Sequence, residues 1–294
     1  MLLHPQNKTP YIIGALVVLL LGTVTYFLMR EEEEIVPPEV IEEVSVVRHE
    51  VIGTSVEGRT IDAYTYGQGD THLIFVGGIH GGYEWNSVLL AYSFMDHLEE
   101  FPELVPEDLS ITIVPSANPD GVFDVVGKEG RFMAIDVPTG LPVGTGRFNA
   151  NGVDLNRNFD CKWAPESTWR GNVVSAGTAA FSEPEAVAIR SLVMKTNPAA
   201  VVFWHSQSNA VYASECEAGI LAGTRTLMNT YATAAGYPAV DVFDAYPITG
   251  DAEGWLASIG IPAITVELST HESIEWQKNL AGFEAVLASY SSER

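Results

Sequence analysis

Four residues between positions 80 and 267 have the side-chain types of a catalytic metal site, namely His80, Glu84, His205 and Glu267. Catalytic zinc typically takes three protein ligands drawn from His and acidic residues, and it keeps one position for water. A nearby carboxylate then accepts a proton from that water. We therefore predict that His80, Glu84 and His205 bind a metal ion and that Glu267 is the base. His271 is the reserve ligand.

Short apolar runs lead up to this set, at residues 72–80, 200–205 and 263–267. Their length, their branched and aromatic residues and the Gly and Pro that bound them predict buried parallel strands. Open α/β sheets bind ligands beyond the carboxyl ends of their strands. A single histidine in such a place is more often a structural residue than a ligand. The prediction therefore depends on the whole set.

The remaining chain alternates strand and helix patterns. We expect strands on both sides of a Glu57-Gly58 turn in 51–66, one ending near Gly77 and one over 109–114. Apolar spacing predicts helices over 86–99, 186–194, 219–235 and 276–290. Asn118-Pro-Asp-Gly121 predicts a turn and 126–157 a long loop. The predicted fold is one α/β domain with a mixed, largely parallel twisted sheet flanked by helices.

The first 46 residues differ in character from the rest. Residues 11–29 carry no charge and are long enough to cross a bilayer as a helix, which favours an uncleaved transmembrane anchor over a cleaved signal peptide. Residues 1–10 then form a short cytoplasmic N-terminus, 30–46 an acidic linker and 47–294 the catalytic domain. We expect a membrane-anchored protein whose catalytic domain is extracytoplasmic.

Charge and cysteine content narrow the function further. The formal net charge is −23 and no basic stripe is visible, which excludes nucleic acid as a partner. The two cysteines, Cys161 and Cys216, are too few for a zinc cluster. Outside the cell they can form a disulfide, and otherwise they are two buried thiols.

Several separated motifs carry a family resemblance. They are Asn118-Pro-Asp-Gly121, Gly152-Val-Asp-Leu-Asn-Arg-Asn-Phe159, Phe203-Trp-His-Ser206 and Thr265-Val-Glu-Leu268. In this order they resemble the zinc carboxypeptidase family, the M14 metallopeptidases, over roughly residues 50 to 290. Most members have two residues between the first histidine and the glutamate, whereas this chain has three between His80 and Glu84. Bacterial members that hydrolyse murein peptides resemble this chain in that longer turn.

The resemblance implies a zinc carboxypeptidase fold, one Zn²⁺ ion and a peptide substrate with a free C-terminal carboxylate. It assigns His80, Glu84 and His205 as zinc ligands, and Glu267 as base and proton shuttle. The other implied roles are terminal-carboxylate binding by Asn156 and Arg157, oxyanion stabilisation by Arg147, closure over the substrate by Tyr246 and orientation of the first histidine by Asp154. The role of Arg157 agrees with its chemistry, since the planar guanidinium can donate two parallel hydrogen bonds to a carboxylate.

Side-chain preference is predicted from Glu253, which stands near the family's specificity position. An acidic group there favours lysine, arginine or the amine end of diaminopimelate, unless it only caps a helix or faces solvent. We therefore expect a zinc-dependent carboxypeptidase, with cell-wall peptides as one candidate substrate class. Two alternatives remain, a zinc amide hydrolase of the aspartoacylase type and a non-catalytic surface module that binds peptide ends.

Overall fold

The computed structural model describes residues 20–23, 25 and 47–292. The chain divides into two compact units, Met1–Val44 and Ser45–Arg294. The predicted cytoplasmic N-terminus at 1–10, most of the predicted anchor at 11–29 and all of the acidic linker at 30–46 lie outside the described residues. Among the residues that are described, no helix is both long enough and apolar enough to span a bilayer.

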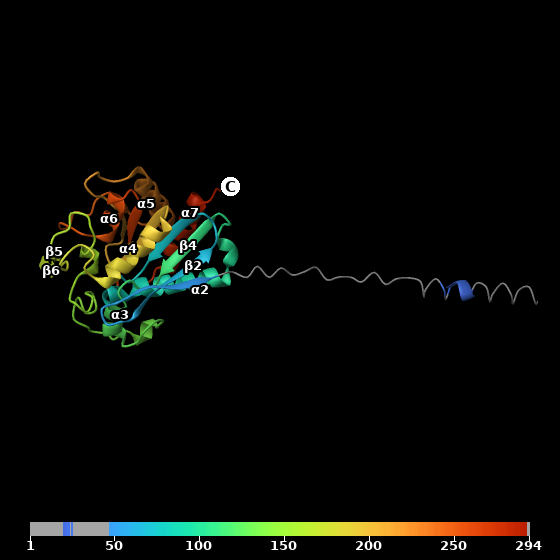
Figure 1. The fold of residues 1–294 in the computed structure, drawn as a ribbon, viewed down its shortest axis with the longest axis horizontal. Helices are drawn as coiled ribbons and strands as arrows, with labels where there is room; N and C mark the ends of the chain where they lie inside the picture. The colour runs from blue at the N-terminus through green and yellow to red at the C-terminus, as the bar shows by residue number, and fades with distance from the viewer. Residues whose placement is uncertain (1–19, 24, 26–46, 293–294) are drawn as a thin grey trace, which may run out of the picture. The chain divides into compact units, whose positions relative to one another are not determined.

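An eight-stranded sheet forms the centre of the second unit (Figure 1). Its spatial order is β1-β2-β4-β3-β7-β10-β8-β9. The strands are β1 (Arg48–Thr54), β2 (Thr60–Gly67), β3 (Thr71–Val76), β4 (Leu109–Val114), β7 (Ala200–Ser206), β8 (Ala210–Ala213), β9 (Ala239–Val240) and β10 (Ala263–Leu268). Strands β4, β3, β7 and β10 run parallel to one another, whereas β1, β2 and β8 pair antiparallel.

The central strands are apolar because helices cover both faces of the sheet. Every residue of β4 and β7 is buried, as the continuous apolar runs predicted. On one face lie α2 (Trp85–Glu100), α5 (Ala222–Ala235) and α7 (Trp276–Tyr290), and on the other α4 (Pro184–Thr196) and α6 (Ala252–Ser258). Trp204 of β7 stacks with Phe75 and with Phe94, at ring-centroid distances of 5.4 and 5.0 Å. The fold is therefore the predicted single, mixed α/β domain.

One predicted turn is instead the start of a helix. The segment Asn118-Pro-Asp-Gly121 opens α3 (Pro119–Val126). The Asn118 side chain accepts a hydrogen bond from the Gly121 amide at 2.9 Å, and Pro119 occupies the first helical turn, where its missing N–H has no cost. The turn prediction was wrong because the same residue types also cap helices.

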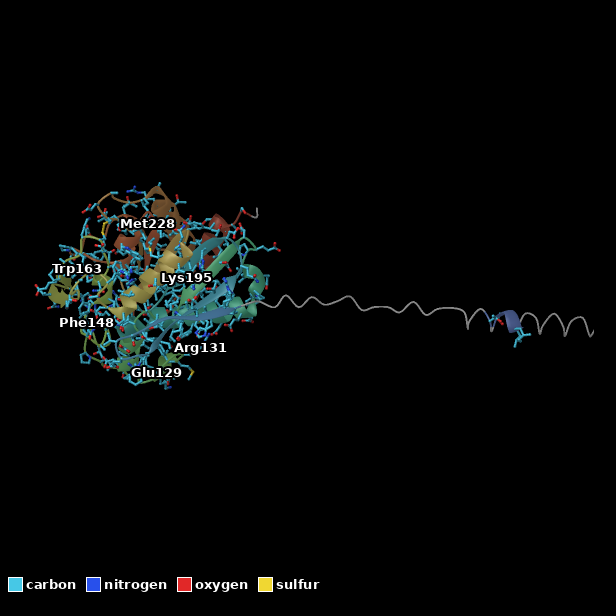
Figure 2. The ribbon with its side chains drawn as sticks, in the orientation of Figure 1. Glu129, Arg131, Phe148, Trp163, Lys195 and Met228 are labelled. Atoms are coloured by element: carbon cyan, nitrogen blue, oxygen red, sulfur yellow. A yellow bond between two sulfur atoms is a disulfide. The ribbon has the colours of Figure 1, made fainter. Side chains whose placement is uncertain are left out.

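A small hairpin lies apart from the main sheet, at the loop-rich end of the domain (Figure 1). It consists of β5 (Glu166–Trp169) and β6 (Asn172–Ser175), joined by a turn at Arg170 and Gly171. Figure 2 shows Phe148 and Trp163 on that same side of the domain. The preceding stretch, 126–157, is mostly loop as predicted, with only short 3-10 turns at Ala134–Asp136 and Leu155–Arg157.

Candidate active site

His80, Glu84 and His205 lie together, and a potential ligand atom of each is within 4.8 Å of the others. These three residues are called the metal group. All three side chains are buried. His80 precedes a 3-10 turn, Gly81–Glu84, that follows β3, and His205 is the penultimate residue of β7. Because β3 and β7 are adjacent parallel strands, their carboxyl ends bring these residues together.

Backbone conformation allows the long spacing between His80 and Glu84. Gly81 has φ = +48°, in the left-handed region that side chains disfavour. A Cβ on Gly81 would lie 2.5 Å from the Gly146 carbonyl oxygen, so no other residue fits this turn. The tight turn thus returns Glu84 to His80 despite the extra residue.

The electrostatics of this group fit a bound cation. His205 Nδ1 lies 3.1 Å from Glu84 Oε2, and His205 Nε2 lies 3.3 Å from Glu253 Oε1. Burial alone lowers the pKa of His205, but the two carboxylates raise it well above its usual value. Burial and the charge of Arg147 hold the pKa of His80 well below its usual value, so His80 is neutral. Zinc binds neutral imidazoles and carboxylates, which are the groups that His80, His205 and Glu84 offer here.

Glu267 lies beside this group on β10, where it is the register partner of His205. Its Oε2 accepts a hydrogen bond from the Ser208 amide at 3.1 Å. Burial, and then the negative charge of Glu84, raise the pKa of Glu267 to about 7. A carboxylate with a pKa near neutrality is suited to take and return a proton at physiological pH.

Arg147 and Asp154 form a buried ion pair next to the metal group. Arg147 Nε and Nη2 donate to Asp154 Oδ2 at 3.1 and 2.8 Å. Arg147 Nη1 remains 3.8 Å from Glu84 Oε1, and the guanidinium lies 4.4 Å from the ring centre of Trp169. Asp154 Oδ1 lies 3.5 Å from His80 Nδ1, which is beyond an ordinary hydrogen bond. Asp154 therefore holds Arg147 more directly than it holds His80.

Asn156 and Arg157 lie on the short 3-10 turn that follows Asp154. Asn156 Oδ1 accepts a hydrogen bond from the Ala252 amide at 2.8 Å, which fixes this turn against α6. Arg157 is buried, and it donates to the carbonyl oxygens of Asn156 at 2.5 Å and Thr168 at 3.3 Å. Its Nε is buried without a partner among the described residues. A buried guanidinium with an unused donor is suited to an incoming anion.

All of these side chains except Asp154 line one cleft of about 570 Å³, a volume typical of ligand pockets. Tyr246 lines the same cleft from the segment between β9 and α6, where its ring packs edge-on against Phe243. The sequence did not indicate two further lining residues, Tyr83 and Trp169, whose rings meet edge-on at 5.3 Å. Their role depends on contacts between distant segments, for which the sequence carries no signal.

Glu253 and His271 have contacts that their sequence positions did not predict. Glu253 is 3% exposed, and its Oε1 receives a hydrogen bond from Thr265 Oγ1 at 2.8 Å as well as facing His205. His271, the reserve ligand, is outside the metal group. Its Nδ1 instead lies 2.7 Å from Ser206 Oγ, and its ring packs against Tyr83. His271 therefore borders the cleft as a neighbour of the metal group.

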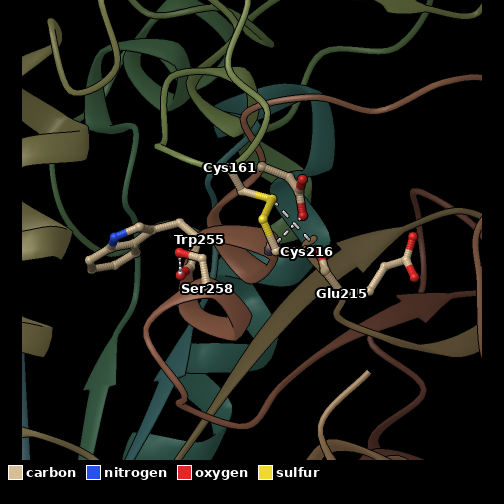
Figure 3. The surroundings of a disulfide bond; sticks show 7 residues. Cys161, Glu215, Cys216, Trp255 and Ser258 are labelled. Atoms are coloured by element: carbon tan, nitrogen blue, oxygen red, sulfur yellow. Dashed lines mark hydrogen bonds between the residues drawn. A yellow bond between two sulfur atoms is a disulfide. The ribbon is translucent and has the colours of Figure 1, made fainter. Parts of the chain in front are cut away.

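Cys161 and Cys216 form a disulfide with a Cα–Cα distance of 6.1 Å (Figure 3). Cys161 lines the cleft, and its carbonyl oxygen accepts a hydrogen bond from the Gly250 amide at 2.8 Å. The Phe159 amide donates to the Gly250 carbonyl oxygen, also at 2.8 Å. The disulfide thus ties the segment after Arg157 to the segment after β8, beside the loop that carries Tyr246.

Comparison with known proteins places this site in a family. The sequence model of the zinc carboxypeptidase family matches residues 40–283 of this chain. A curated relative, gamma-D-glutamyl-L-diamino acid endopeptidase 1 of Lysinibacillus sphaericus, is 24% identical over 241 residues, 74% of this chain. The aligned region spans only 60% of that relative's length.

Solved structures agree on the fold. Murein-tripeptide amidase MpaA from Escherichia coli O157 has a TM-score of 0.58 and 24% identity, over 84% of this chain and 93% of that protein. Carboxypeptidase A from Helicoverpa armigera has a TM-score of 0.62 and 20% identity, over 85% and 70%. The family match covers most of the chain, and the buried His–Glu–His group is compatible with the family's metal. The chain therefore belongs to the zinc carboxypeptidase family, whose cofactor is one Zn²⁺ ion.

Proposed function

We propose that this protein is a metallocarboxypeptidase that hydrolyses the C-terminal peptide bond of peptides. Arg157 carries the proposal, since it is buried in the cleft and has no carboxylate within 4.0 Å among the described residues. A charge left unpaired in a protein with 38 acidic and 15 basic residues has its counterion in the substrate. A terminal carboxylate at Asn156 and Arg157 leaves the preceding peptide bond within the same cleft.

The remaining residues then divide the chemistry. His80, Glu84 and His205 hold the zinc ion, which when bound polarises the scissile carbonyl and acidifies the attacking water. Glu267 takes the proton of that water and returns it to the leaving amine. Arg147 Nη1, which makes no hydrogen bond with Asp154 and lies 3.8 Å from Glu84 Oε1, stabilises the developing oxyanion, and Asp154 fixes the orientation of the guanidinium. Tyr246 covers the bound end of the peptide.

For the leaving residue we propose a basic or amino-bearing side chain, recognised by Glu253. The contacts of this carboxylate with Thr265 and His205 both use Oε1, and Glu253 lines the cleft, so its negative charge faces the bound peptide. Relatives with similar sequence or fold are named for a diamino acid and for murein tripeptide. Cell-wall peptides that end in a diamino acid are therefore the substrate class we favour.

A peptide panel tests this function. The zinc-loaded protein is incubated with blocked peptides ending in lysine, arginine, diaminopimelate, leucine or glutamate, and with the C-terminal amide of each. Release of the last residue only from free carboxylates, fastest for the diamino and basic ends, supports the proposal. Glu267→Gln is the control for contaminating peptidase. A protein that retains zinc and binds these peptides but releases nothing overturns the proposal.

We also propose that residues 11–29 anchor the protein in a membrane and that the catalytic domain lies outside the cytoplasm. The uncharged length of this segment and the disulfide of the domain support this, because disulfides persist in oxidising compartments. Membrane fractions washed with alkaline carbonate should retain the full chain and lose a variant without residues 1–46. Recovery of the full chain in the soluble fraction contradicts the anchor.

A further inference from the structure

Most of the described Lys and Arg side chains are paired with carboxylates, and most of those that are not paired line the cleft. Seven of the described Lys and Arg side chains lie within 4.0 Å of an acidic oxygen. The five others are Arg48, Arg157, Lys162, Arg170 and Arg190. Three of these five, Arg157, Lys162 and Arg170, line the cleft. The same cleft is also lined by acidic residues, so the three cations give it separate positive positions beside negative ones.

Arg170 is placed to receive a negative charge. It is exposed in the turn between β5 and β6, and its Nη1 donates to the Tyr83 hydroxyl at 3.4 Å. Because tyrosine is neutral, this contact orients the guanidinium without compensating its charge. Tyr83 directly precedes Glu84 of the metal group, so Arg170 reaches the cleft close to the reaction centre.

Four consecutive residues of the hairpin, Ser167–Arg170, contact residues that line the cleft or lie next to it. The contacts are Ser167 Oγ with Thr249 Oγ1 at 3.0 Å, Thr168 O with Arg157 Nη2 at 3.3 Å, the Trp169 ring with the Arg147 guanidinium at 4.4 Å, and Arg170 with Tyr83. This strand therefore runs along the cleft from the segment after Tyr246, past the carboxylate-binding arginine, to the oxyanion arginine and beyond.

These contacts set an order along the cleft. β5 ends at Trp169, and Arg170 lies in the turn that follows, where its contact with Tyr83 comes directly after the contact of Trp169 with Arg147. With the terminal carboxylate at Arg157 and the scissile carbonyl at Arg147, the next side chain on the acyl side comes level with Arg170. We propose that Arg170 binds a carboxylate on the residue that precedes the scissile bond. This inference rests on the proposed carboxypeptidase function.

Two kinds of residue present such a carboxylate. An aspartate or glutamate in ordinary linkage presents its side chain, whereas a glutamate linked through its γ-carboxyl presents its main-chain carboxylate. Both carry the same charge near the scissile bond, and Arg170 recognises the chemistry that they share.

Matched peptides test this inference on the zinc-loaded full chain. Each ends in the same lysine and carries, before the scissile bond, α-linked Glu, α-linked Gln, γ-linked Glu or γ-linked Glu with its main-chain carboxylate amidated. We expect kcat/KM to be about three- to tenfold higher for an acid than for its neutral match, as for a partly solvated ion pair. Arg170→Gln should bring this ratio toward one, and Arg170→Lys should retain part of it. Added salt should lower the ratio in the wild type.

Arg48→Gln is the matched control, because Arg48 is also exposed and unpaired but lies on β1, away from the cleft. It should leave the ratio unchanged. If only the α-linked pair of peptides shows the preference, Arg170 recognises a side-chain carboxylate. If only the γ-linked pair shows it, Arg170 recognises a main-chain carboxylate. A wild-type ratio near one, or a ratio that Arg170→Gln does not change, overturns the inference while the carboxypeptidase function stands. If no peptide is cleaved, the proposed function fails and the inference fails with it.

Discussion

The cleft has two walls that differ in construction. The strand wall comprises His80, Glu84, His205 and Glu267, which lie at or just after the ends of β3, β7 and β10. The loop wall comprises Arg147, Arg157, Trp169 and Tyr246, which lie in the stretch between α3 and β6 and in the segment before α6. Three neighbouring parallel strands position the first wall, whereas hydrogen bonds, ring contacts and a disulfide position the second.

The difference separates the proposed chemistry from the recognition of the substrate. Metal ligands and a proton shuttle need positions fixed to a fraction of an ångström, which paired strands inside a packed core provide. Recognition of the substrate tolerates more movement, and loops vary without disturbing the core. Variants of the strand wall should therefore change kcat. Variants of the loop wall should mainly change KM, except at Arg147, which acts on the developing oxyanion and so also changes kcat.

The largest effect is expected for the strand wall residue Glu267. Glu267→Gln removes the base without removing a metal ligand, because Glu267 is outside the metal group. We expect kcat to fall by about 10³-fold while the zinc content stays at one ion per chain. Steady-state kinetics and metal analysis measure the two quantities, with His205→Gln as the variant that should lose zinc. A kcat within tenfold of the wild type would contradict the assignment of the base.

The disulfide tests how far the loop wall depends on a covalent tie. Replacing both Cys161 and Cys216 with Ser opens a cross-link between residues 55 positions apart. The free energy of unfolding should fall by about 2–4 kcal/mol, because the unfolded chain gains freedom. Urea denaturation measures this loss, and the zinc content of the folded variant serves as the control. If the variant unfolds at the wild-type urea concentration, the hydrogen bonds and ring contacts hold the loop wall without the disulfide.

Arg157 tests recognition by the loop wall. Arg157→Gln removes the charge that we expect to meet the terminal carboxylate, and kcat/KM should fall by about 10- to 100-fold, mainly through KM. Peptide amides, which lack that carboxylate, should be hydrolysed equally slowly by the wild type and the variant. The exposed and unpaired Arg48→Gln provides the charge-matched control. Equal losses on free and amidated peptides would show that Arg157 acts through folding.

The strand wall is also the wall that the sequence predicted best. The strands predicted over 200–205 and 263–267 match β7 and β10 to within one residue at their ends. Local apolar patterns fix such elements, and buried parallel strands place the residues at their ends together. His80, Glu84 and His205 were therefore predictable as neighbours, even with the longer turn between the first two.

The loop wall was predictable only in part. The resemblance to a family pointed to Arg147, Arg157 and Tyr246, but nothing local indicated the hairpin that carries Trp169. A four-residue strand has little periodicity, and its place is set by side chains far along the sequence, such as Thr249. Glu253 shows the same limit, because its contact with His205 spans 48 positions and arises only when β7 and α6 pack together. Such contacts are properties of the tertiary structure.

The smallest predicted effect links the two walls through charge. Glu267 must be ionised to act as a base, so kcat/KM is lost as the pH falls through its pKa. Burial and the charge of Glu84 raise that pKa to about 7, whereas the charge of Arg147, on the loop wall, lowers it. Bound zinc also lowers the pKa of Glu267. The acidic limb of the profile of kcat/KM against pH, where activity is lost as the pH falls, should therefore lie below pH 7 in the zinc-loaded enzyme.

Removing the Arg147 charge should move that limb in a defined direction. In Arg147→Gln the pKa of Glu267 should rise, and the acidic limb should shift to higher pH by at most about one unit. The pH dependence of kcat/KM measures this shift separately from the loss of rate, and Arg157→Gln is the loop-wall comparison. A limb that stays in place would show that Arg147 acts on the substrate alone and that the walls do not share their charges. A limb that moves would show that the loop wall also adjusts the base on the strand wall.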